Sequence, residues 1–177
     1  MNKIMTIKKA QNNDDEAFNK LIDSCKKKLY MIAFSYLKSE QHSLDAVSDT
    51  VYKAYMNINK LKMPKFFNTW IIKILMNSCN DILKANNKVI YIDEYYKIDE
   101  NISGTSESEF NMANNIDLYT AIDKLNEKFK SIVILKYLED MTISQISEVL
   151  DLPEGTVKVY LRRAIGLLKI ELGEECI

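Results

Sequence analysis

The chain has 177 residues, of which 47% are hydrophobic and 28% are charged, with a formal net charge of -1. Such a chain can bury a core as one ordinary domain or two small ones, which excludes a disordered polypeptide. Only 4 Gly and 2 Pro argue against a turn-rich all-β fold. The composition therefore favours an all-α protein rich in long helices.

Several classes of protein are disfavoured by what the sequence lacks. Residues 1–18 hold no apolar stretch of signal-peptide length, and no window is apolar enough to span a membrane, so we expect a cytoplasmic location and no membrane insertion. Cys25, Cys79 and Cys176 are too far apart for a zinc cluster or a disulfide framework. His42 is the single histidine, and no glycine-rich phosphate loop occurs. We expect no enzyme, no metal, no cofactor and no small-molecule substrate.

Charge divides the chain into three parts. Residues 1–87 hold 14 Lys against 8 acids, residues 88–116 hold 2 Lys against 6 acids, and residues 117–177 hold 8 Lys and Arg against 11 acids. The net charges are thus +6, -4 and -3. A basic front half and an acidic remainder indicate that different segments meet different partners.

Three helices are predicted in the front half, because apolar residues recur there at steps of three and four. They cover about 14–38, then 44–58 after a polar break at 39–43, and about 68–85. A basic loop at 57–65 separates the last two, with Pro64 as a breaker or first-turn residue. The third helix should bury one stripe and leave a second face polar and basic. The buried stripe is predicted to hold Phe67, Ile71, Ile74, Leu75, Ser78 and Ile82.

Residues 88–116 lack helical periodicity, so we predict a flexible linker. Within it, VIYIDEYY is a candidate for a short extended segment. The 29 residues of the linker could span up to ~95 Å when stretched. The sequence thus predicts two small helical domains, 14–87 and 117–172, that can act on separate sites.

A helix-turn-helix pattern marks the second domain. Two helices with a break at Asn126 come first. Thr142 and Gln145 then form a capping box that begins a helix of about eight residues. After a turn, Pro153 begins a helix that extends to about 172, and such a second helix enters the major groove of DNA. A helical hairpin that merely carries basic residues is the alternative. The outward candidates for DNA contact are Glu154, Thr156, Lys158, Arg162 and Arg163.

These residues resemble a known family, the extracytoplasmic-function sigma factors of bacterial RNA polymerase. The run from LNEKFKSIVILKYLEDM to PEGTVKVYLRRAIGLLKIEL looks like region 4 of that family. In the front half, YMIAFSYLKS, LDAVSDTVYKAY and FFNTWIIKILMNSCNDILK are similar to regions 2.1, 2.2 and 2.3 to 2.4. The resemblance implies an alternative sigma factor whose first domain binds core polymerase and the -10 element, and whose second domain binds the -35 element.

The resemblance also implies partners and site residues. Asp45 and Asp49 fall where the family binds the β′ clamp helices of polymerase, although His42, Leu44 and Ser48 depart from the usual Asp, Glu and Gln. Region 4 implies contact with the β flap. The basic loop and the following helix resemble the part that captures the unpaired -10 strand. The candidates for that contact are Lys60, Lys62, Lys65, Asn68, Lys73, Asn77 and Asn80.

Some positions remain open at this stage. Trp70 is expected to pack at the domain edge rather than to stack on a base. Val159 and Tyr160 replace the usual Ser and Arg, so one phosphate contact is missing, for which Arg162 and Arg163 could compensate. The resemblance further implies an anti-sigma factor, and the front half looks like the lysozyme-responsive branch of Gram-positive bacteria. Two rival functions are a stand-alone helix-turn-helix regulator and a helical adaptor or anti-sigma-like protein.

Overall fold

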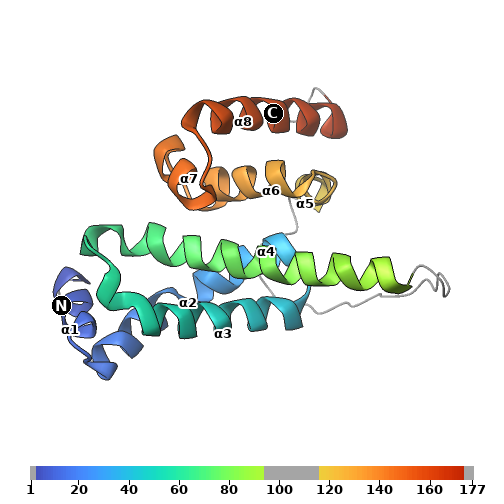
Figure 1. Ribbon diagram of the computed structural model, residues 1–177. Coiled ribbons are helices and arrows are strands. Elements are labelled where there is room, and N and C mark those ends of the chain that lie inside the picture. Colours follow the sequence, from blue (N-terminus) through green and yellow to red (C-terminus); the bar gives the residue numbers. More distant parts are fainter. Residues whose placement is uncertain (1–2, 94–115, 174–177) are drawn as a thin grey trace.

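The computed structural model describes residues 3–93 and 116–173, which form two groups of helices (Figure 1). Within these two ranges every regular element is helical, as predicted, and there is no strand. Most of the predicted linker lies outside the described residues. The first group contains α1 (Lys3–Gln11), α2 (Asp15–Leu37), α3 (Glu40–Asn57), η1 (Ile58–Lys60), η2 (Pro64–Phe66) and α4 (Phe67–Asp93). The second contains α5 (Ile116–Asp123), α6 (Glu127–Val133), η3 (Ile134–Leu138), α7 (Ile143–Leu150) and α8 (Glu154–Leu172).

Side-chain caps set the ends of the front helices. Asp14 caps α2 by accepting a hydrogen bond from the Ala17 amide, and α2 ends at Lys38 in the left-handed conformation. Ser39 then caps α3 through the His42 amide. The predicted polar break at 39–43 is therefore wrong except at its first residue, because a polar stretch that begins with a capping serine starts a helix as readily as it interrupts one.

Helix α1 was not predicted from the sequence. It buries only three side chains, Thr6, Ile7 and Ala10, and this stripe is too short to show a helical period. It packs against α2 and against both turns of the loop between α3 and α4. The front group thus has four helices where three were predicted.

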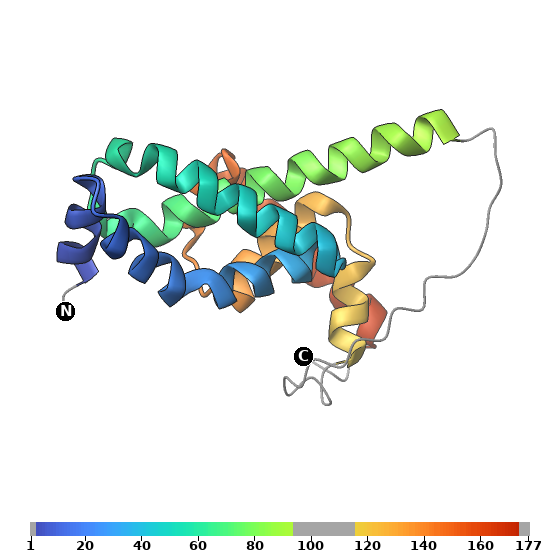
Figure 2. The same cartoon turned by 90° about the horizontal axis from the view of Figure 1, so that it is seen from below.

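Helix α4 is longer than predicted. The segment 89–93, expected to be extended, is helical, and Figure 2 shows the last turns of α4 projecting beyond the other helices. The sequence from Phe67 to Asp93 contains neither Gly nor Pro, so nothing in it stops the helix. The extended-piece prediction is therefore wrong for these residues, and the remainder of that segment lies outside the described part of the chain.

Helix α4 also buries more than the single predicted stripe. Phe67, Ile71, Leu75 and Ser78 are buried as expected, whereas Ile74 and Ile82 are half-buried. A second stripe of Ile72, Met76 and Cys79 is buried as well. Residues so spaced share one side of a helix, about a quarter turn from the first stripe. Helix α4 packs against α2 and α3 of its own group and also against α7 of the second group, so it buries more than one stripe.

The second group follows the predicted order. Asn126 caps α6 through the Phe129 amide, and α6 continues into a wider π-helical turn, η3. The Thr142 and Gln145 side chains form both hydrogen bonds of the predicted capping box at the start of α7. Pro153 stands immediately before α8 rather than inside it. These capping signals are local, which is why sequence alone located them.

The two groups pack together rather than standing apart on a tether. One apolar core contains buried residues from α1 to α4 and also from α6 to α8. Ion pairs cross the boundary as well: Lys73 to Asp151 at 2.6 Å, Lys28 to Glu139 at 2.7 Å and Lys38 to Asp123 at 3.1 Å. In Figure 1 the second group lies along α4, with α8 on the side remote from it.

Candidate nucleic-acid interface

The turn between α7 and α8 is held by a compact set of hydrogen bonds. Asp151 ends α7 in the left-handed conformation, with a φ of 53°. The Leu152 amide donates to the Ser147 carbonyl at 3.1 Å, and the Ser147 hydroxyl donates to the Leu152 carbonyl at 2.5 Å. These bonds fix the direction in which α8 leaves the turn, as a helix-turn-helix unit requires.

The outer face of α8 carries four charged side chains with no partner in the described part of the chain. The inner face of α8 holds its buried residues, Val157, Ala164 and Leu168. The predicted contact residues Glu154, Lys158, Arg162 and Arg163 are exposed, and Thr156 is half-buried. Among the residues that the structure describes, none pairs with these four charged side chains. The face can therefore offer Lys and Arg donors to phosphates and base edges without first breaking internal contacts.

The loop between α3 and α4 consists of the two short turns η1 and η2. Lys60, Lys62 and Lys65 are all exposed on it. Two exposed apolar side chains, Met63 and Phe66, accompany the lysines, and the Lys65 ammonium lies 4.8 Å from the centre of the Phe66 ring. Phe66 is not among the residues predicted from the sequence. An exposed aromatic ring among lysines is a suitable surface for stacking an unpaired base.

The candidates on α4 divide into exposed and half-buried residues. Asn68 and Asn77 are exposed. Lys73 forms the ion pair with Asp151 of the α7 to α8 turn, and Asn80 accepts a 2.8 Å hydrogen bond from the Tyr36 hydroxyl. Trp70 is half-buried and packs against the core, as predicted. Lys73 and Asn80 thus lie at the boundary with the second group, away from the loop candidates.

The two acids on α3 also differ from each other. Asp45 is exposed and accepts a 3.1 Å hydrogen bond from Gln41. Asp49 is half-buried and accepts 2.6 Å contacts from Lys53 and Ser78. Burial opposes ionisation of Asp49, but the hydrogen bonds from Lys53 and Ser78 and the charge of Lys53 outweigh it and lower the pKa of its carboxyl. Of the pair, Asp45 is the acid available to an outside partner.

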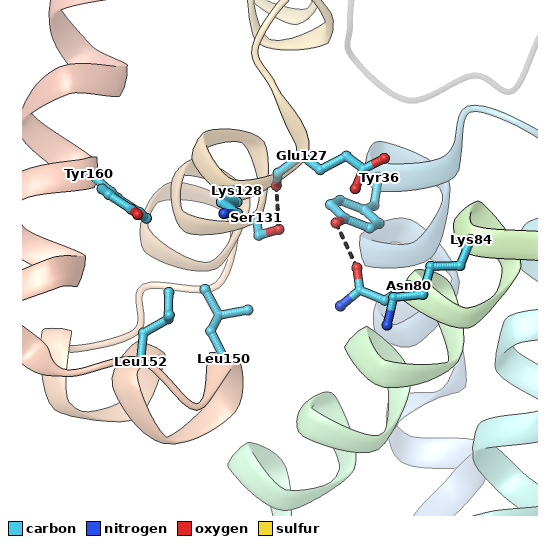
Figure 3. A pocket seen from close by; sticks show the side chains of 9 residues that line it. All are labelled: Tyr36, Asn80, Lys84, Glu127, Lys128, Ser131, Leu150, Leu152 and Tyr160. Atoms are coloured by element: carbon cyan, nitrogen blue, oxygen red, sulfur yellow. Dashed lines mark hydrogen bonds between the residues drawn. The ribbon is translucent and has the colours of Figure 1, made fainter. Parts of the chain in front are cut away.

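A pocket of about 280 Å³ lies at the boundary of the two groups (Figure 3). Tyr36 and Asn80 line it from the first group, and Leu150, Leu152 and Tyr160 line it from the second. Burial is the main reason that the pKa of the Tyr36 hydroxyl is raised, so it remains a hydrogen-bond donor at neutral pH. The pocket is where the two groups meet without filling the space between them.

The described residues offer neither a metal-binding cluster nor a membrane-spanning helix. Within 3–93 and 116–173, no cluster of three His, Cys, Asp or Glu side chains could hold a metal ion. No helix in the same ranges has the length and apolar character needed to cross a membrane. Burial raises the pKa of the Cys79 thiol to about 12 and also raises that of Cys25, so both thiols stay protonated at neutral pH.

Comparison with known proteins agrees with this arrangement. Residues 21–89 match the family Sigma-70 region 2, and residues 116–168 match the family Sigma-70, region 4. The RNA polymerase sigma factor SigV of Bacillus subtilis is 32% identical over 150 residues, which cover 85% of this chain and 87% of the relative. The ECF RNA polymerase sigma factor SigW of the same organism is 25% identical, over 94% of each chain.

Solved structures share the fold. The sigma factor RpoE of Bartonella quintana, crystallised with the anti-sigma factor NepR, superposes with a TM-score of 0.72 at 18% identity, covering 89% of this chain and 98% of the other. CnrH in complex with the cytosolic domain of CnrY gives 0.70 at 18% identity, with 98% of each chain covered. Together with the two matched regions and the SigV identity, these comparisons show that the chain belongs to the sigma-70 family and is an alternative sigma factor of the extracytoplasmic-function type, which directs the initiation of transcription.

Proposed function

We propose that the two helical domains have the separate binding roles predicted from the sequence. Residues 14–87 bind core polymerase and capture the -10 strand, and residues 117–172 dock on the -35 duplex, with 88–116 as the linker. The observation that carries this proposal is the outer face of α8. A helix held by a helix-turn-helix turn presents Lys158, Arg162 and Arg163 to solvent, and none of the three pairs with a residue in 3–93 or 116–173.

Within the first group, the loop and the start of α4 are proposed to hold the unpaired strand. Lys60, Lys62 and Lys65 supply positive charge for phosphates, and Phe66 supplies a ring for stacking. Asn68 and Asn77 extend the same exposed surface along α4. Lys73 and Asn80 join it only when their internal contacts with Asp151 and Tyr36 are exchanged for contacts with DNA.

Core polymerase is proposed to bind α3 through Asp45, since a basic coiled coil such as the β′ clamp helices complements an exposed acid. Asp49 joins this contact after releasing Lys53 or Ser78. Region 4 is expected to rest on the β flap. No catalytic role is proposed, because bond formation belongs to the polymerase.

The packing of the two groups is proposed to be the resting arrangement. The names of the -10 and -35 elements place them about 25 base pairs apart, or about 85 Å of duplex at 3.4 Å per base pair. The α7 to α8 turn, by contrast, touches α4 through Asp151 and Lys73. The second group therefore has to leave α4 when both promoter elements are occupied.

Regulation by an anti-sigma factor is part of the proposal. Both structural relatives above were solved with a protein partner, and that of RpoE is named an anti-sigma factor. We propose that the chain belongs to the lysozyme-responsive branch and shares its inducing signal. The proposed location is the cytoplasm, because polymerase works there.

Reconstituted transcription tests the proposal. Transcript starts mapped after forced expression define a promoter, and the purified chain plus core polymerase should initiate there. Asp45→Lys should abolish core binding, while Asp23→Lys, a charge reversal on the exposed side of α2, should leave it unchanged. A wild-type chain that never binds core, or equal binding by Asp45→Lys, would overturn the respective assignment.

A further inference from the structure

Helix α1 holds the loop between α3 and α4 through one side chain. The Gln11 side-chain amide nitrogen donates to the Ile58 carbonyl at 3.1 Å and to the Leu61 carbonyl at 2.7 Å. Those carbonyls stand at the first residue of η1 and directly after its last residue. One amide group, which has two N–H donors, therefore ties both ends of the turn that carries Lys60.

A second contact joins the start of α1 to the start of α4. The Lys3 ammonium donates to the Asn68 side-chain oxygen at 2.8 Å and lies 5.7 Å from the centre of the Phe67 ring. An ammonium can only donate, so the Asn68 oxygen must face Lys3. The Asn68 amide nitrogen is then left to donate toward a ligand, and such a donor favours a base that presents a carbonyl oxygen.

The loop itself offers little to fix its shape. Between α3 and α4 it contains only the two short turns, and the side chains of Lys60, Lys62, Met63 and Lys65 are all exposed. Ile58 and Leu61 are its buried anchors, and Gln11 holds the carbonyls of these same two residues. The backbone path of the exposed lysines is thus set from α1.

We propose that Gln11 and Lys3 are positioning residues for capture of the -10 strand: Gln11 sets the path of the loop, and Lys3 orients the Asn68 amide as a donor. This inference rests on the proposed role of the loop. It assigns α1 a part in promoter choice, because a captured base is discriminated only if the loop around it keeps one shape. A loop that Gln11 already holds in one shape loses less conformational freedom when the strand binds than a loop that is not held.

Gln11→Glu is the sharpest test, because it keeps the side chain's size and removes both donors. In holoenzyme with the full chain, we expect promoter opening, measured by permanganate reactivity of unpaired thymines, to fall about tenfold, as two net hydrogen bonds allow. Discrimination between the cognate -10 element and single-base variants should weaken by a similar factor. Core binding and -35 duplex binding should stay unchanged.

Lys9→Ala, also exposed on α1, is the matched control, and it should open the promoter like the wild type. Gln11→Ala gives a second variant should the glutamate disturb folding, which circular dichroism monitors. Asn68→Asp keeps the contact with Lys3 but removes the outward donor, and should lose base discrimination while still opening the promoter.

Two results would overturn the inference. One is wild-type base discrimination in Gln11→Glu and in Gln11→Ala. The other is a loss of core binding as large as the loss of opening, since α1 would then only stabilise the fold. Failure of the wild-type chain to open any promoter with core is a different result, and it would overturn the proposed function itself.

Discussion

The two surfaces proposed to bind DNA differ in the internal contacts that their polar side chains make. On α8, Glu154, Lys158, Arg162 and Arg163 are exposed, and none of them pairs with a residue in the described ranges. On the front group, Lys60 contacts Asn57, Lys73 contacts Asp151, and Asn80 contacts Tyr36. The duplex-binding face is therefore ready in the packed chain, whereas strand capture requires that internal contacts be exchanged.

This difference suits the two tasks. Duplex DNA keeps nearly the same shape before and after binding, so a rigid helix with free charges can meet it directly. An unpaired strand exists only after the duplex opens, and its binding site can be partly occupied by the protein until then. Four predictions test this comparison, beginning with the largest expected effect.

Replacing both Arg162 and Arg163 by Ala should weaken binding to the -35 duplex by about 30-fold or more, because each arginine that contacts a base or phosphate contributes about 1–3 kcal/mol. The slope of log affinity against log salt should fall by one or two. Fluorescence anisotropy over a range of salt concentrations measures both. Lys169→Ala, an exposed position near the other end of α8, is the control. Equal losses in the two variants would place the contact elsewhere.

Asp151→Asn should release Lys73 while keeping the left-handed turn, which Asn tolerates. Because Asp151 is largely exposed, the ion pair is worth at most about 1 kcal/mol, so holoenzyme should bind a single-stranded -10 oligonucleotide up to about fivefold more tightly. Asp140 is also left-handed and exposed, and it forms no ion pair with any described residue, so Asp140→Asn is the control. The same gain in both variants would mean that only net charge matters.

Gly155 and Gly166 provide a matched pair on α8. An added Cβ would meet no atom within 4 Å at either position, so alanine should stabilise the helix, by about 0.8 kcal/mol at the interior Gly166. That corresponds to a rise in Tm of about 2–3 °C. Only Gly155→Ala should also weaken -35 binding, because Gly155 lies beside Glu154 on the proposed DNA face. Thermal denaturation and anisotropy separate the two effects, and identical DNA binding by both variants would remove Gly155 from the interface.

The smallest expected effect concerns Glu139, whose side chain is 5% exposed and pairs with Lys28 across the boundary. Burial raises the pKa of this carboxyl, against the hydrogen bond and charge of Lys28. The packed chain therefore holds the proton more tightly than the unfolded chain, and stability falls as pH rises from the ordinary value through the raised pKa. The side chain at position 139 cannot ionise in the Glu139→Gln variant. The difference between the Tm of this variant and the Tm of the wild type should therefore increase over that pH interval, by a few degrees at most. Glu148→Gln, at an exposed site, should show no such trend, and a parallel pH profile for Glu139→Gln would refute the account.

The elements that sequence analysis predicted correctly are those with local signals. The Thr142 and Gln145 capping box, the Asn126 cap and the buried stripe beginning at Phe67 each depend on residues within a few turns. The features it missed depend on distant contacts. The wide buried surface of α4 depends on packing against α2, α3 and α7, which are distant from it in the sequence, and α1 is too short to show periodicity.

The same distinction holds for the candidate site. Exposure of Lys158, Arg162 and Arg163 followed from their spacing on α8. The engagement of Lys73 by Asp151 could not be predicted, because the two residues are 78 positions apart and meet only through packing of the two groups. Phe66 was missed because its exposure depends on how the η2 turn is placed, which no periodic pattern records.

The contact between α1 and the loop bears on how the protein should be handled in the laboratory. Lys3 and Gln11 lie close to the amino end of the chain, beside the loop that carries Lys60. A purification tag fused there, or a start codon chosen a dozen residues too late, would alter this neighbourhood while leaving α3 and α8 untouched. On the proposed role of α1, preparations of that kind should assemble with polymerase yet show altered promoter preferences, so tag-free protein is the appropriate reference.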